Sequence, residues 1–334
     1  MAPAADSSPF FTVIISTRNR PILFRRALDS VVEQGFADRE IFAIVDGCDE
    51  EYLQAYHQLE QDYDQVNFLW LQHRADGHGQ SYTMNHGVAH SEGRYLCFLD
   101  DDDHWTDNDY LQRAHACIVG SQQAVDVHYS NQRAFYADGS EHAAPLWLED
   151  LVSEIEAGSP HIDDSFYVDA DFLLLSEGFA HLNCSIFSRD FYQAIGGMDE
   201  SIRYENDRDI FLRSIDAADI ILYSTRVMSR HNIPDGTMRL NMSTAASAVD
   251  KKLYQIRVFD KGICHCKHPS VLQRCRLGKT YELKHLTELL VNRSDYARAA
   301  FYAREALTNG FNLRWLGYTL FLSMRSLVSR EPVN

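Results

Sequence analysis

Short apolar runs alternate with amphipathic stretches along the first third of the chain. Residues 10–16 are apolar and rich in β-branched side chains, which predicts a buried strand. Pro21 then begins a segment whose apolar residues recur at helical spacing. The same alternation predicts further strands at 40–45, 66–71 and 95–99 and further helices at 50–63 and 81–90. Strands that alternate with helices predict an α/β fold with a mostly parallel, doubly wound, Rossmann-like sheet.

The pattern becomes less regular after residue 124. We expect strands at 125–130 and 132–136, joined by a short turn, and strand character again at 180–187. The stretch from 149 to 171 is acidic and predicts a loop suited to substrate contacts or to acting as a mobile lid. Residues 204–213 begin a helix with carboxylates in its first turn, where the helix dipole favours them.

Only helical patterns remain from about residue 246 onwards, so we divide the chain into an α/β domain at 1–245 and an all-helical region at 246–334. Residues 295–307 resemble the second helix of a tetratricopeptide repeat, with 281–292 as its partner and 312–328 as the next helix. One repeat and a half is too short for a solenoid. We therefore expect a helical appendage rather than a repeat array.

The last predicted helix carries Leu313, Leu316, Leu320, Met324 and Leu327 along one face. Such a face can pack in a core, pair with a second copy as a homodimer, or make a peripheral contact with a membrane. Packing or dimerisation is the commoner use in soluble proteins, and the three alternatives stay open.

Composition narrows the class of protein. The chain has 334 residues, of which 45% are hydrophobic and 24% charged, as in an ordinary globular protein. Its net charge of −17 argues against nucleic-acid binding, because no basic stripe offsets it. No apolar run is long enough to span a bilayer, and the N-terminal residues lack the basic and apolar regions of a signal peptide. We expect a cytoplasmic protein, with membrane association at the cytoplasmic face as an option for the last helix.

Cysteine usage agrees with that compartment, since seven cysteines are scattered along the chain. Cys264, Cys266 and His268 lie close together in sequence, and thiolates and imidazoles are zinc ligands. Their spacing lacks the two-residue gap of a zinc knuckle. We therefore favour buried or helix-capping roles for this cluster over a zinc site.

The most informative chemistry is the run of four consecutive carboxylates, Asp100 to Asp103, which directly follows the predicted strand at 95–99. Carboxylates this close repel one another and raise one another's pKa unless they share a cation. Oxygen ligands suit a hard divalent ion, which predicts a Mg²⁺ or Mn²⁺ site with positions left for water and substrate phosphates. The alternative is a solvated acidic turn that caps a helix.

Polar residues also follow two other predicted strands. Thr17 comes after the strand at 10–16, and Asp46 comes after the strand at 40–45. Ligands of doubly wound sheets bind outside the carboxyl ends of the strands. We therefore expect Thr17, Asp46 and the aspartate run to meet at one edge of the sheet and form a single site.

Taken in order, the motifs resemble those of the inverting nucleotide-sugar glycosyltransferases of family 2, which have the GT-A fold. The matching blocks are Val13-Ile-Ile-Ser-Thr-Arg-Asn-Arg20, Val45-Asp-Gly-Cys-Asp49, the stretch 93–105 around the aspartates, Gly196-Gly-Met-Asp-Glu200, and Glu205-Asn-Asp-Arg-Asp-Ile-Phe-Leu-Arg213. No block is decisive alone, but five blocks in the family's order make a specific match over about residues 10–240.

The resemblance implies a donor site at the first two strand ends. Thr17, Arg18 and Asn19 would line the nucleotide base and ribose, and Asp46 would accept a hydrogen bond from the base. The family often has an arginine-asparagine pair on the helix before the aspartates. Here methionine replaces the arginine, and Asn85 is retained as a donor-binding residue.

The resemblance also implies a metal site. Asp102 would bind Mn²⁺ or Mg²⁺ directly, with Asp100 or Asp101 directed to the ribose. The ion would bridge the diphosphate and neutralise it as it leaves. His231 would add a metal or diphosphate contact, with a plain loop histidine as an equal alternative.

The implied reaction moves a sugar from a nucleotide-sugar donor to a hydroxyl in glycan or glycoconjugate synthesis. Asp207 would be the general base that deprotonates the acceptor, with Glu205 as the second choice. The acceptor would be a glycan, a lipid-linked sugar or a protein side chain. We expect a UDP-sugar, but Val45 replaces one of two acids that the family often has there, so GDP- and dTDP-sugars stay open.

Other classes fit the sequence less well. A sugar-phosphate nucleotidyltransferase would have a glycine-rich loop after the first strand, and Thr17-Arg-Asn-Arg-Pro21 has no glycine. A haloacid-dehalogenase-like phosphatase has its Asp-x-Asp motif on the first strand of the domain. The non-enzyme alternative is a catalytically degenerate transferase domain that serves as a binding or scaffold module through its C-terminal helices. Retention of both Asp102 and Asp207 argues against it.

Overall fold

The computed structural model describes residues 8–234 and 246–328. Most of the N-terminal segment that the sequence predicts not to be a signal peptide lies outside the described residues. The chain divides into two compact units, Met1–Asp235 and Gly236–Asn334, which are described separately. The predicted domain boundary between residues 245 and 246 adjoins residues outside this description and stays a prediction.

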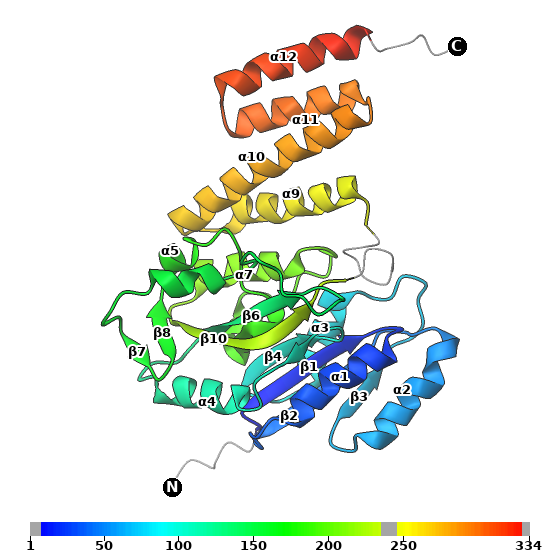
Figure 1. Cartoon of the computed structure of the whole chain (residues 1–334), viewed down its shortest axis with the longest axis vertical. Coiled ribbons are helices and arrows are strands. Elements are labelled where there is room, and N and C mark those ends of the chain that lie inside the picture. Colours follow the sequence, from blue (N-terminus) through cyan, green and yellow to red (C-terminus); the bar gives the residue numbers. More distant parts are fainter. Residues whose placement is uncertain (1–7, 235–245, 329–334) are drawn as a thin grey trace. The chain divides into compact units, whose positions relative to one another are not determined.

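The first unit is built on one mixed sheet with the strand order β3-β2-β1-β4-β9-β6-β10-β8-β7, and β5 pairs with β10 (Figure 1). The neighbours β3, β2, β1 and β4 run parallel, and so do β6 and β10, whereas β9 runs antiparallel between β4 and β6. The strands are β1 (Phe11–Thr17), β2 (Arg39–Val45), β3 (Asn67–Trp70), β4 (Tyr95–Asp100), β5 (His104–Trp105), β6 (Val127–Phe135), β7 (His161–Ile162), β8 (Ser165–Val168), β9 (Ser185–Ser188) and β10 (Ile221–Asn232).

Helices cover both faces of this sheet. Alternate residues of β1 point to opposite sides: Val13 packs in the core that includes Phe24, whereas Ile14 lies against Gly87. The helices are α1 (Pro21–Val32), α2 (Glu50–Asp62), α3 (Gln80–His90), α4 (Tyr110–Gly120), α5 (Ala170–Leu173), α6 (Arg189–Ala194) and α7 (Asn206–Ala217), with 3₁₀ turns η1 (Glu149–Glu154) and η2 (Leu182–Cys184). The prediction of a doubly wound α/β fold is confirmed.

The prediction of two strands around residue 131 is wrong, because β6 continues without a turn from Val127 to Phe135. The predicted turn falls at Asn131, between strands predicted at 125–130 and 132–136, but Asn131 and its neighbour Gln132 are both buried. The amide of Asn131 donates to the Tyr223 hydroxyl at 2.8 Å. The carbonyl of Gln132 accepts from Asn183 at 3.2 Å. Buried polar side chains that find partners of this kind do not interrupt a strand.

The prediction of a loop at 149–171 is wrong in part. This stretch contains the turn η1 and the strand β8, which pairs antiparallel with β10 as part of the sheet. The strand predicted at 180–187 is shorter than expected, because β9 begins only at Ser185. The residues before it form the 3₁₀ turn η2. The His181 side chain caps this turn by accepting a hydrogen bond from the Asn183 backbone amide.

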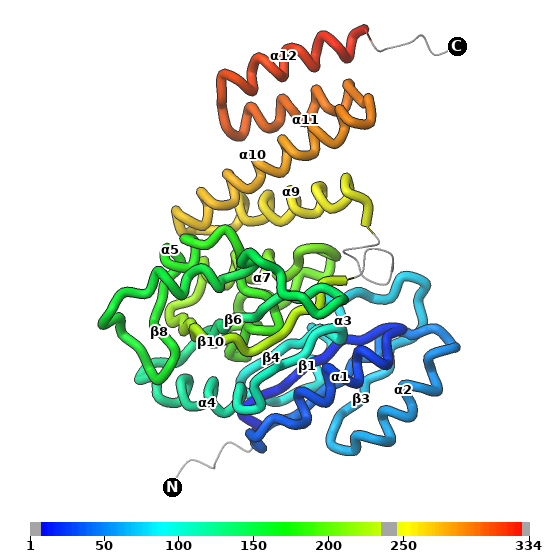
Figure 2. The backbone as a smooth tube through the Cα atoms, viewed as in Figure 1, coloured from blue at the N-terminus to red at the C-terminus, as the bar shows by residue number. Residues whose placement is uncertain are grey.

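The second unit is all-helical, as predicted. It consists of α9 (Ala248–His265), α10 (Pro269–Asn292), α11 (Tyr296–Asn309) and α12 (Leu313–Val328), and each helix packs on the next as the chain runs back and forth (Figure 2). Leucines of α10 meet small alanines of α11 in a shared core, which allows the helix axes to approach closely. The helix predicted at 281–292 is the C-terminal half of the longer α10.

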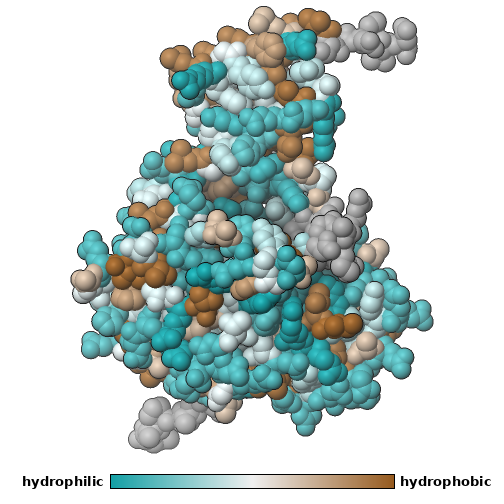
Figure 3. Space-filling view, viewed as in Figure 1, coloured by the Kyte–Doolittle hydropathy of each residue, from teal (hydrophilic) through white to brown (hydrophobic). Residues whose placement is uncertain are grey.

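One face of α12 remains uncovered. Leu313 is 76% exposed and Leu327 is 70% exposed, while Thr319 and Leu322 on the opposite face are buried. Hydrophobic side chains are visible over this helix in Figure 3. None of the described helices is both long and apolar enough to cross a membrane. The homodimer or peripheral membrane contact through these helices stays a prediction.

The three cysteines of the second unit differ in their exposure to solvent. Cys264 is exposed, Cys266 is partly buried and Cys275 is fully buried. Two groups of side chains in the described ranges are close enough to share a metal ion, and neither includes Cys264, Cys266 or His268.

Candidate active site

The three polar strand ends meet at one edge of the sheet, as the sequence predicts. Thr17 pairs with Val45, which places Asp46 directly beyond it, and Asp100 pairs with Ser16 on the other side of β1. Parallel register therefore brings the ends of β2, β1 and β4 together. The aspartate run leaves this edge as the turn between β4 and β5.

Arg20, which the sequence analysis left out, holds two members of the aspartate run. It is the residue before α1, and its guanidinium binds both Asp101 and Asp102, the latter at 3.0 Å. Burial raises the pKa of Asp101 to about 6, although the charge of Arg20 lowers it. Asp101 is thus committed to an ion pair inside the protein. Its place next to Arg18 and Asn19 is the signal that could have identified Arg20.

The segment predicted to line the donor site, residues 17–19, is held in place by hydrogen bonds and an ion pair. The Thr17 hydroxyl is buried and lies 2.7 Å from the Tyr56 hydroxyl. Asn19 and Asp49 hydrogen bond reciprocally, with both contacts at 2.8 Å. The Arg18 guanidinium lies 3.4 Å from the Asp49 carboxylate. Asn19 has a positive φ of 58°, so these contacts stabilise a backbone turn that few residues adopt.

Asp46 is held by backbone donors. Its carboxylate accepts from the amide of His78 at 2.8 and 3.0 Å and from the amide of Gly79 at 3.0 Å. Gly77 has φ +62°, and a Cβ at that position would lie 2.6 Å from Asp46 Oδ2. The glycine therefore lets the backbone approach the carboxylate closely enough to bind it.

Asn85 has a different environment from the one predicted. Its carbonyl accepts from the Tyr192 hydroxyl at 2.8 Å and from the Met198 amide at 3.0 Å. Its amide group donates to the Met198 carbonyl at 2.9 Å and to Glu200 at 3.0 Å. These contacts tie α3 to the Gly196–Glu200 segment, so they support a role in packing. Donor binding by Asn85 stays a prediction.

Carboxylate oxygens of Asp100, Asp102 and Asp103 lie within 4.8 Å of one another. Burial raises the pKa of Asp100 well above its usual value, and the charges of Asp103 and Asp102 raise it further. A cluster of acidic oxygens that is this costly to ionise fits a shared divalent cation, for which oxygen ligands are appropriate. The donor set therefore fits Mn²⁺ or Mg²⁺.

Asp103, to which the sequence analysis gave no role apart from its place in the aspartate run, is bound by side-chain and backbone donors. It is fully buried and accepts from His231 Nδ1 at 2.8 Å, from Asn183 Nδ2 at 2.6 Å and from the Asn232 amide at 2.7 Å. Burial alone would raise the pKa of Asp103, but the charge and hydrogen bond of His231 lower it below the usual value.

His231 lies beside Asp103, and its metal or diphosphate contact stays a prediction. Its ligand atom groups with those of Asp103 and His181 within 4.8 Å. Burial lowers the pKa of His231, but the Asp103 charge outweighs burial and the pKa rises to about 9. In the absence of a metal ion, His231 is therefore the cation that balances Asp103.

The predicted base lies across the site from these carboxylates. Asp207 is in the first turn of α7, and its Oδ1 accepts from the Arg208 amide at 2.8 Å. Burial raises the pKa of Asp207 to about 6, and the neighbouring Glu205 charge contributes. Glu205 caps the helix with a left-handed backbone, φ 58°, and binds Arg208 Nε at 2.6 Å. Glu205 is thus paired with a cation, whereas the pKa of Asp207 is raised.

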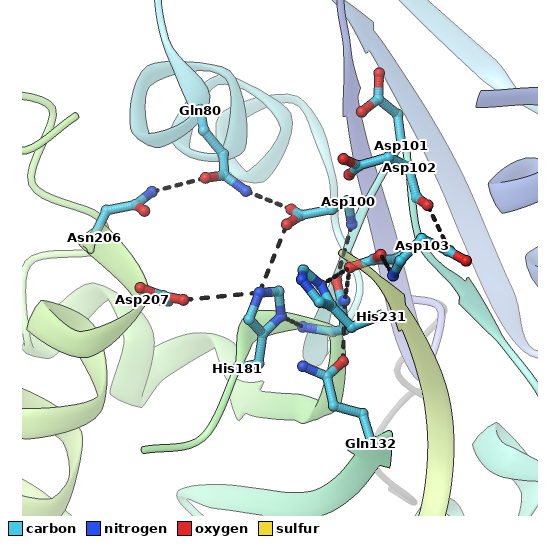
Figure 4. A network of polar contacts seen from close by, with 12 residues as sticks. Gln80, Asp100, Asp101, Asp102, Asp103, Gln132, His181, Asn206, Asp207 and His231 are labelled. Carbon is cyan, nitrogen blue, oxygen red and sulfur yellow. Dashed lines mark hydrogen bonds and ion pairs between the residues drawn. The ribbon is translucent and has the colours of Figure 1, made fainter. Parts of the chain in front are cut away.

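Two polar bridges connect Asp100 with the start of α7 (Figure 4). In one, the Gln80 amide donates to Asp100 and its carbonyl accepts from Asn206 at 3.1 Å. In the other, His181 Nε2 lies 3.8 Å from Asp100 Oδ2 and 3.8 Å from Asp207 Oδ2. Gln80, His181 and Asn206 were not among the predicted site residues.

The sequence is similar to those of several glycosyltransferases. The chain is 30% identical over 95 residues to a GalNAc(5)-diNAcBac-PP-undecaprenol beta-1,3-glucosyltransferase of Campylobacter jejuni, a match that covers 28% of this chain and 30% of that protein. The matches span less than half the length of the curated relatives.

Solved structures share the fold at low identity. S. aureus TarS 1-349 in complex with UDP-GlcNAc aligns with a TM-score of 0.66 at 14% identity, over 95% of this chain and 88% of that chain. Mannosyltransferase PcManGT from Pyrobaculum calidifontis, in complex with GDP-Man and Mn2+, aligns with a TM-score of 0.53 at 15% identity, over 98% and 88%. These likenesses agree with the GT-A fold and its helical C-terminal region.

The sequence itself decides the family. The family model described as "Glycosyl transferase family 2" matches residues 12–193, which include the aspartate run and the turn before β9. Because this match covers more than half of the chain, the protein belongs to glycosyl transferase family 2.

Proposed function

We propose that the protein transfers a sugar from a UDP-sugar to a hydroxyl acceptor, with inversion at the anomeric carbon. The observation that carries this proposal is the position of Asp207, a partly buried carboxylate of raised pKa, across from the cluster formed by Asp100, Asp102 and Asp103. A base on one side and a site for a charged diphosphate on the other are what a single in-line displacement needs.

In this reaction Asp207 takes the proton of the acceptor hydroxyl. The acceptor oxygen forms a bond to the anomeric carbon while the bond from that carbon to the diphosphate oxygen breaks. The electron pair of that bond leaves with the nucleoside diphosphate. A pKa of about 6 suits Asp207 to the task, because the group is ionised near neutral pH and is still more basic than an exposed aspartate.

The leaving diphosphate needs positive charge. A Mn²⁺ or Mg²⁺ ion held by Asp102, together with Asp100 and Asp103, would stabilise the charge that develops on it, with His231 beside Asp103 as a further contact. Arg20 keeps Asp101 and Asp102 in place at the same edge. We assign Asp102 as the direct ligand and Asp207 rather than Glu205 as the base, because Arg208 already pairs with Glu205.

UDP is our choice of nucleotide. A fold relative binds UDP-GlcNAc, and another binds GDP-Man. Asp46, Arg18 and Asn19 form the proposed nucleotide side of the site, and Thr17 supports it from the core. The acceptor class is a glycan or glycoconjugate hydroxyl. The Campylobacter relative, whose name specifies an undecaprenol-linked glycan, supports a lipid-linked acceptor as one member of that class.

A thermal-shift panel tests the donor and metal together. UDP, GDP, dTDP and CDP are added to the wild type and to Asp102→Ala, each with and without Mn²⁺, and Asp64→Asn serves as an exposed-aspartate control. We expect UDP to raise the melting temperature only when Mn²⁺ is present, and Asp102→Ala to abolish that increase, since a ligand stabilises only the state that binds it. If no nucleotide shifts the wild type, the transferase proposal fails and the degenerate scaffold is favoured.

A further inference from the structure

His181 is fixed in one tautomer by its own backbone turn. Its Nδ1 accepts the amide N–H of Asn183 at 3.3 Å, which caps η2. A neutral imidazole that accepts at Nδ1 carries its proton on Nε2. The donor of His181 therefore points into the site.

This Nε2–H faces two carboxylates at equal distance. It lies 3.8 Å from Oδ2 of Asp100, at the end of β4, and 3.8 Å from Oδ2 of Asp207, in the first turn of α7 (Figure 4). Contacts of this length in a ligand-free site commonly shorten when substrate binds. One N–H thus lies between the carboxylate at the diphosphate side and the carboxylate at the acceptor side.

The ring has little freedom to move. The Trp147 ring packs edge-on against it at a centroid distance of 5.7 Å. The His181 carbonyl accepts from the Ser185 hydroxyl at 2.8 Å and from the Cys184 amide at 3.1 Å. The turn that carries His181 is therefore held at its backbone as well as at its side chain.

The same turn also fixes the aspartate run. Asn183 Oδ1 accepts the Asp100 amide N–H at 3.0 Å, and Asn183 Nδ2 donates to Asp103 at 2.6 Å. Asp100 and His181 consequently share one rigid frame. The position of Asp207 is the remaining variable, and His181 faces it directly.

Asp100 and Asp207 differ in the other hydrogen-bond donors that contact them. Asp100 also accepts from the Gln80 side chain. Asp207 accepts from the backbone amide of Arg208, and His181 Nε2 lies 3.8 Å from its Oδ2. Removal of the His181 donor should thus affect the base more than the diphosphate side.

We propose that His181 is a positioning residue, whose Nε2–H orients the Asp207 carboxylate relative to Asp100 for proton removal from the acceptor. The inference deepens the proposed function and rests on it. His181 acts here as a neutral donor and not as a metal ligand.

The test compares three variants with the wild type. His181→Leu fills the space without a donor, His181→Gln restores an N–H of similar reach, and Gln80→Leu removes a donor from Asp100 instead. Release of UDP from UDP-glucose, UDP-galactose and UDP-GlcNAc, with water as acceptor, gives kcat and KM. The Mn²⁺ concentration that half-saturates the UDP thermal shift measures the metal site independently of activity.

We expect His181→Leu to lower kcat about 10- to 100-fold, with KM and the Mn²⁺ midpoint within about threefold of wild type. His181→Gln should recover most of kcat. Gln80→Leu should affect metal binding more than catalysis. We expect it to raise the Mn²⁺ midpoint and to lower kcat less than His181→Leu does.

Three results would overturn the inference. One is an unchanged kcat in a folded His181→Leu. Another is loss of Mn²⁺-dependent UDP binding in that variant, which would make the imidazole a ligand. The third is a His181→Gln protein that binds UDP normally but is as slow as His181→Leu. A wild type without any Mn²⁺-dependent UDP shift would instead refute the proposed function itself.

Discussion

Asp103 and Asp207 lie at the same site, the first fully and the second partly buried, and their surroundings change their pKa values in opposite directions. Asp103 accepts three hydrogen bonds, one of them from the His231 cation, and its pKa lies below the usual value despite burial. Asp207 has a backbone amide and a neutral imidazole nearby, with Glu205 adding negative charge, and burial raises its pKa to about 6.

The difference teaches that burial alone does not make a carboxylate a base. The desolvation penalty is common to both residues, and the number and charge of the donors decide the outcome. A carboxylate that is matched by a cation stays an anion and serves structure or metal binding. A carboxylate whose neighbouring charges do not outweigh the effect of burial keeps its affinity for a proton, which is the property that catalysis uses.

Among the variants that test this comparison, Asp207→Asn is expected to have the largest effect. It removes the proposed base, so kcat for UDP release should fall about 100- to 10,000-fold, while the Mn²⁺-dependent UDP shift is retained. The folded-state pKa of Asp207 is raised, so its contribution to stability is present at low pH and is lost as pH rises through about 6. The variant should therefore be more stable than wild type at pH 8, by about 1–2 kcal/mol.

The control is Asp190→Asn, which changes an exposed aspartate in the first turn of α6. It should leave both kcat and stability close to wild type. If Asp207→Asn kept its activity, the assignment of the base would be wrong. If it were less stable than wild type at pH 8, the account of its pKa would be wrong.

Asp103→Asn tests the other member of the pair. It leaves the His231 cation buried without its counter-charge, so the free energy of unfolding should fall by about 3 kcal/mol. Urea denaturation at pH 7 measures this, with the exposed Asp64→Asn as the matched control. A loss of less than about 1 kcal/mol would show that His231 is not a charged partner of Asp103.

The pH dependence of stability follows from His231. Its pKa is raised in the folded state to about 9 from an ordinary value of 6.5, so its stabilising contribution is complete below pH 6.5 and is lost as pH rises through 9. Metal-free protein should lose about 2 kcal/mol between these pH values. His231→Gln should flatten this part of the curve, and a wild-type curve that is already flat would refute the assignment.

Gly77→Ala extends the comparison to Asp46, a carboxylate that is held by backbone amides. The new Cβ would lie 2.6 Å from Asp46 Oδ2, whereas at Gly139, also at positive φ, nothing lies within 4 Å. Gly77→Ala should cost about 1 kcal/mol more than Gly139→Ala and should weaken UDP binding a few-fold. Equal effects of the two variants on stability and on UDP binding would mean that the Asp46 cradle is unimportant.

The sequence predicted the parallel half of the fold well. Thr17, Asp46 and Asp100 follow buried strands, and parallel register brings the ends of such strands to one edge. The same reasoning missed His181 and Asn183, which precede a strand. Because β9 runs antiparallel between β4 and β6, its beginning lies at the edge where its neighbours end. Strand direction, which a linear pattern does not reveal, decided this part of the site.

Local polarity was a second source of error. A turn was predicted at Asn131, beside Gln132, and neither Arg20 nor Asp103 was given a role of its own. Each of them satisfies a partner that is distant in sequence: Tyr223 for Asn131, Asn183 for Gln132, Asp101 for Arg20 and His231 for Asp103. Such pairs depend on tertiary structure, and sequence spacing carries no trace of them.

The antiparallel β9 also has a consequence for how the enzyme can be altered. The segments that shape the proposed nucleotide side follow β1, β2 and β4, whereas the residues that face Asp207 come from the chain between α5 and β9. The short turn at His181–Asn183 and the side chain of Gln80 join the two sets. We therefore expect exchange of residues 174–180 with those of another family member to alter the surroundings of Asp207 more than those of Asp46.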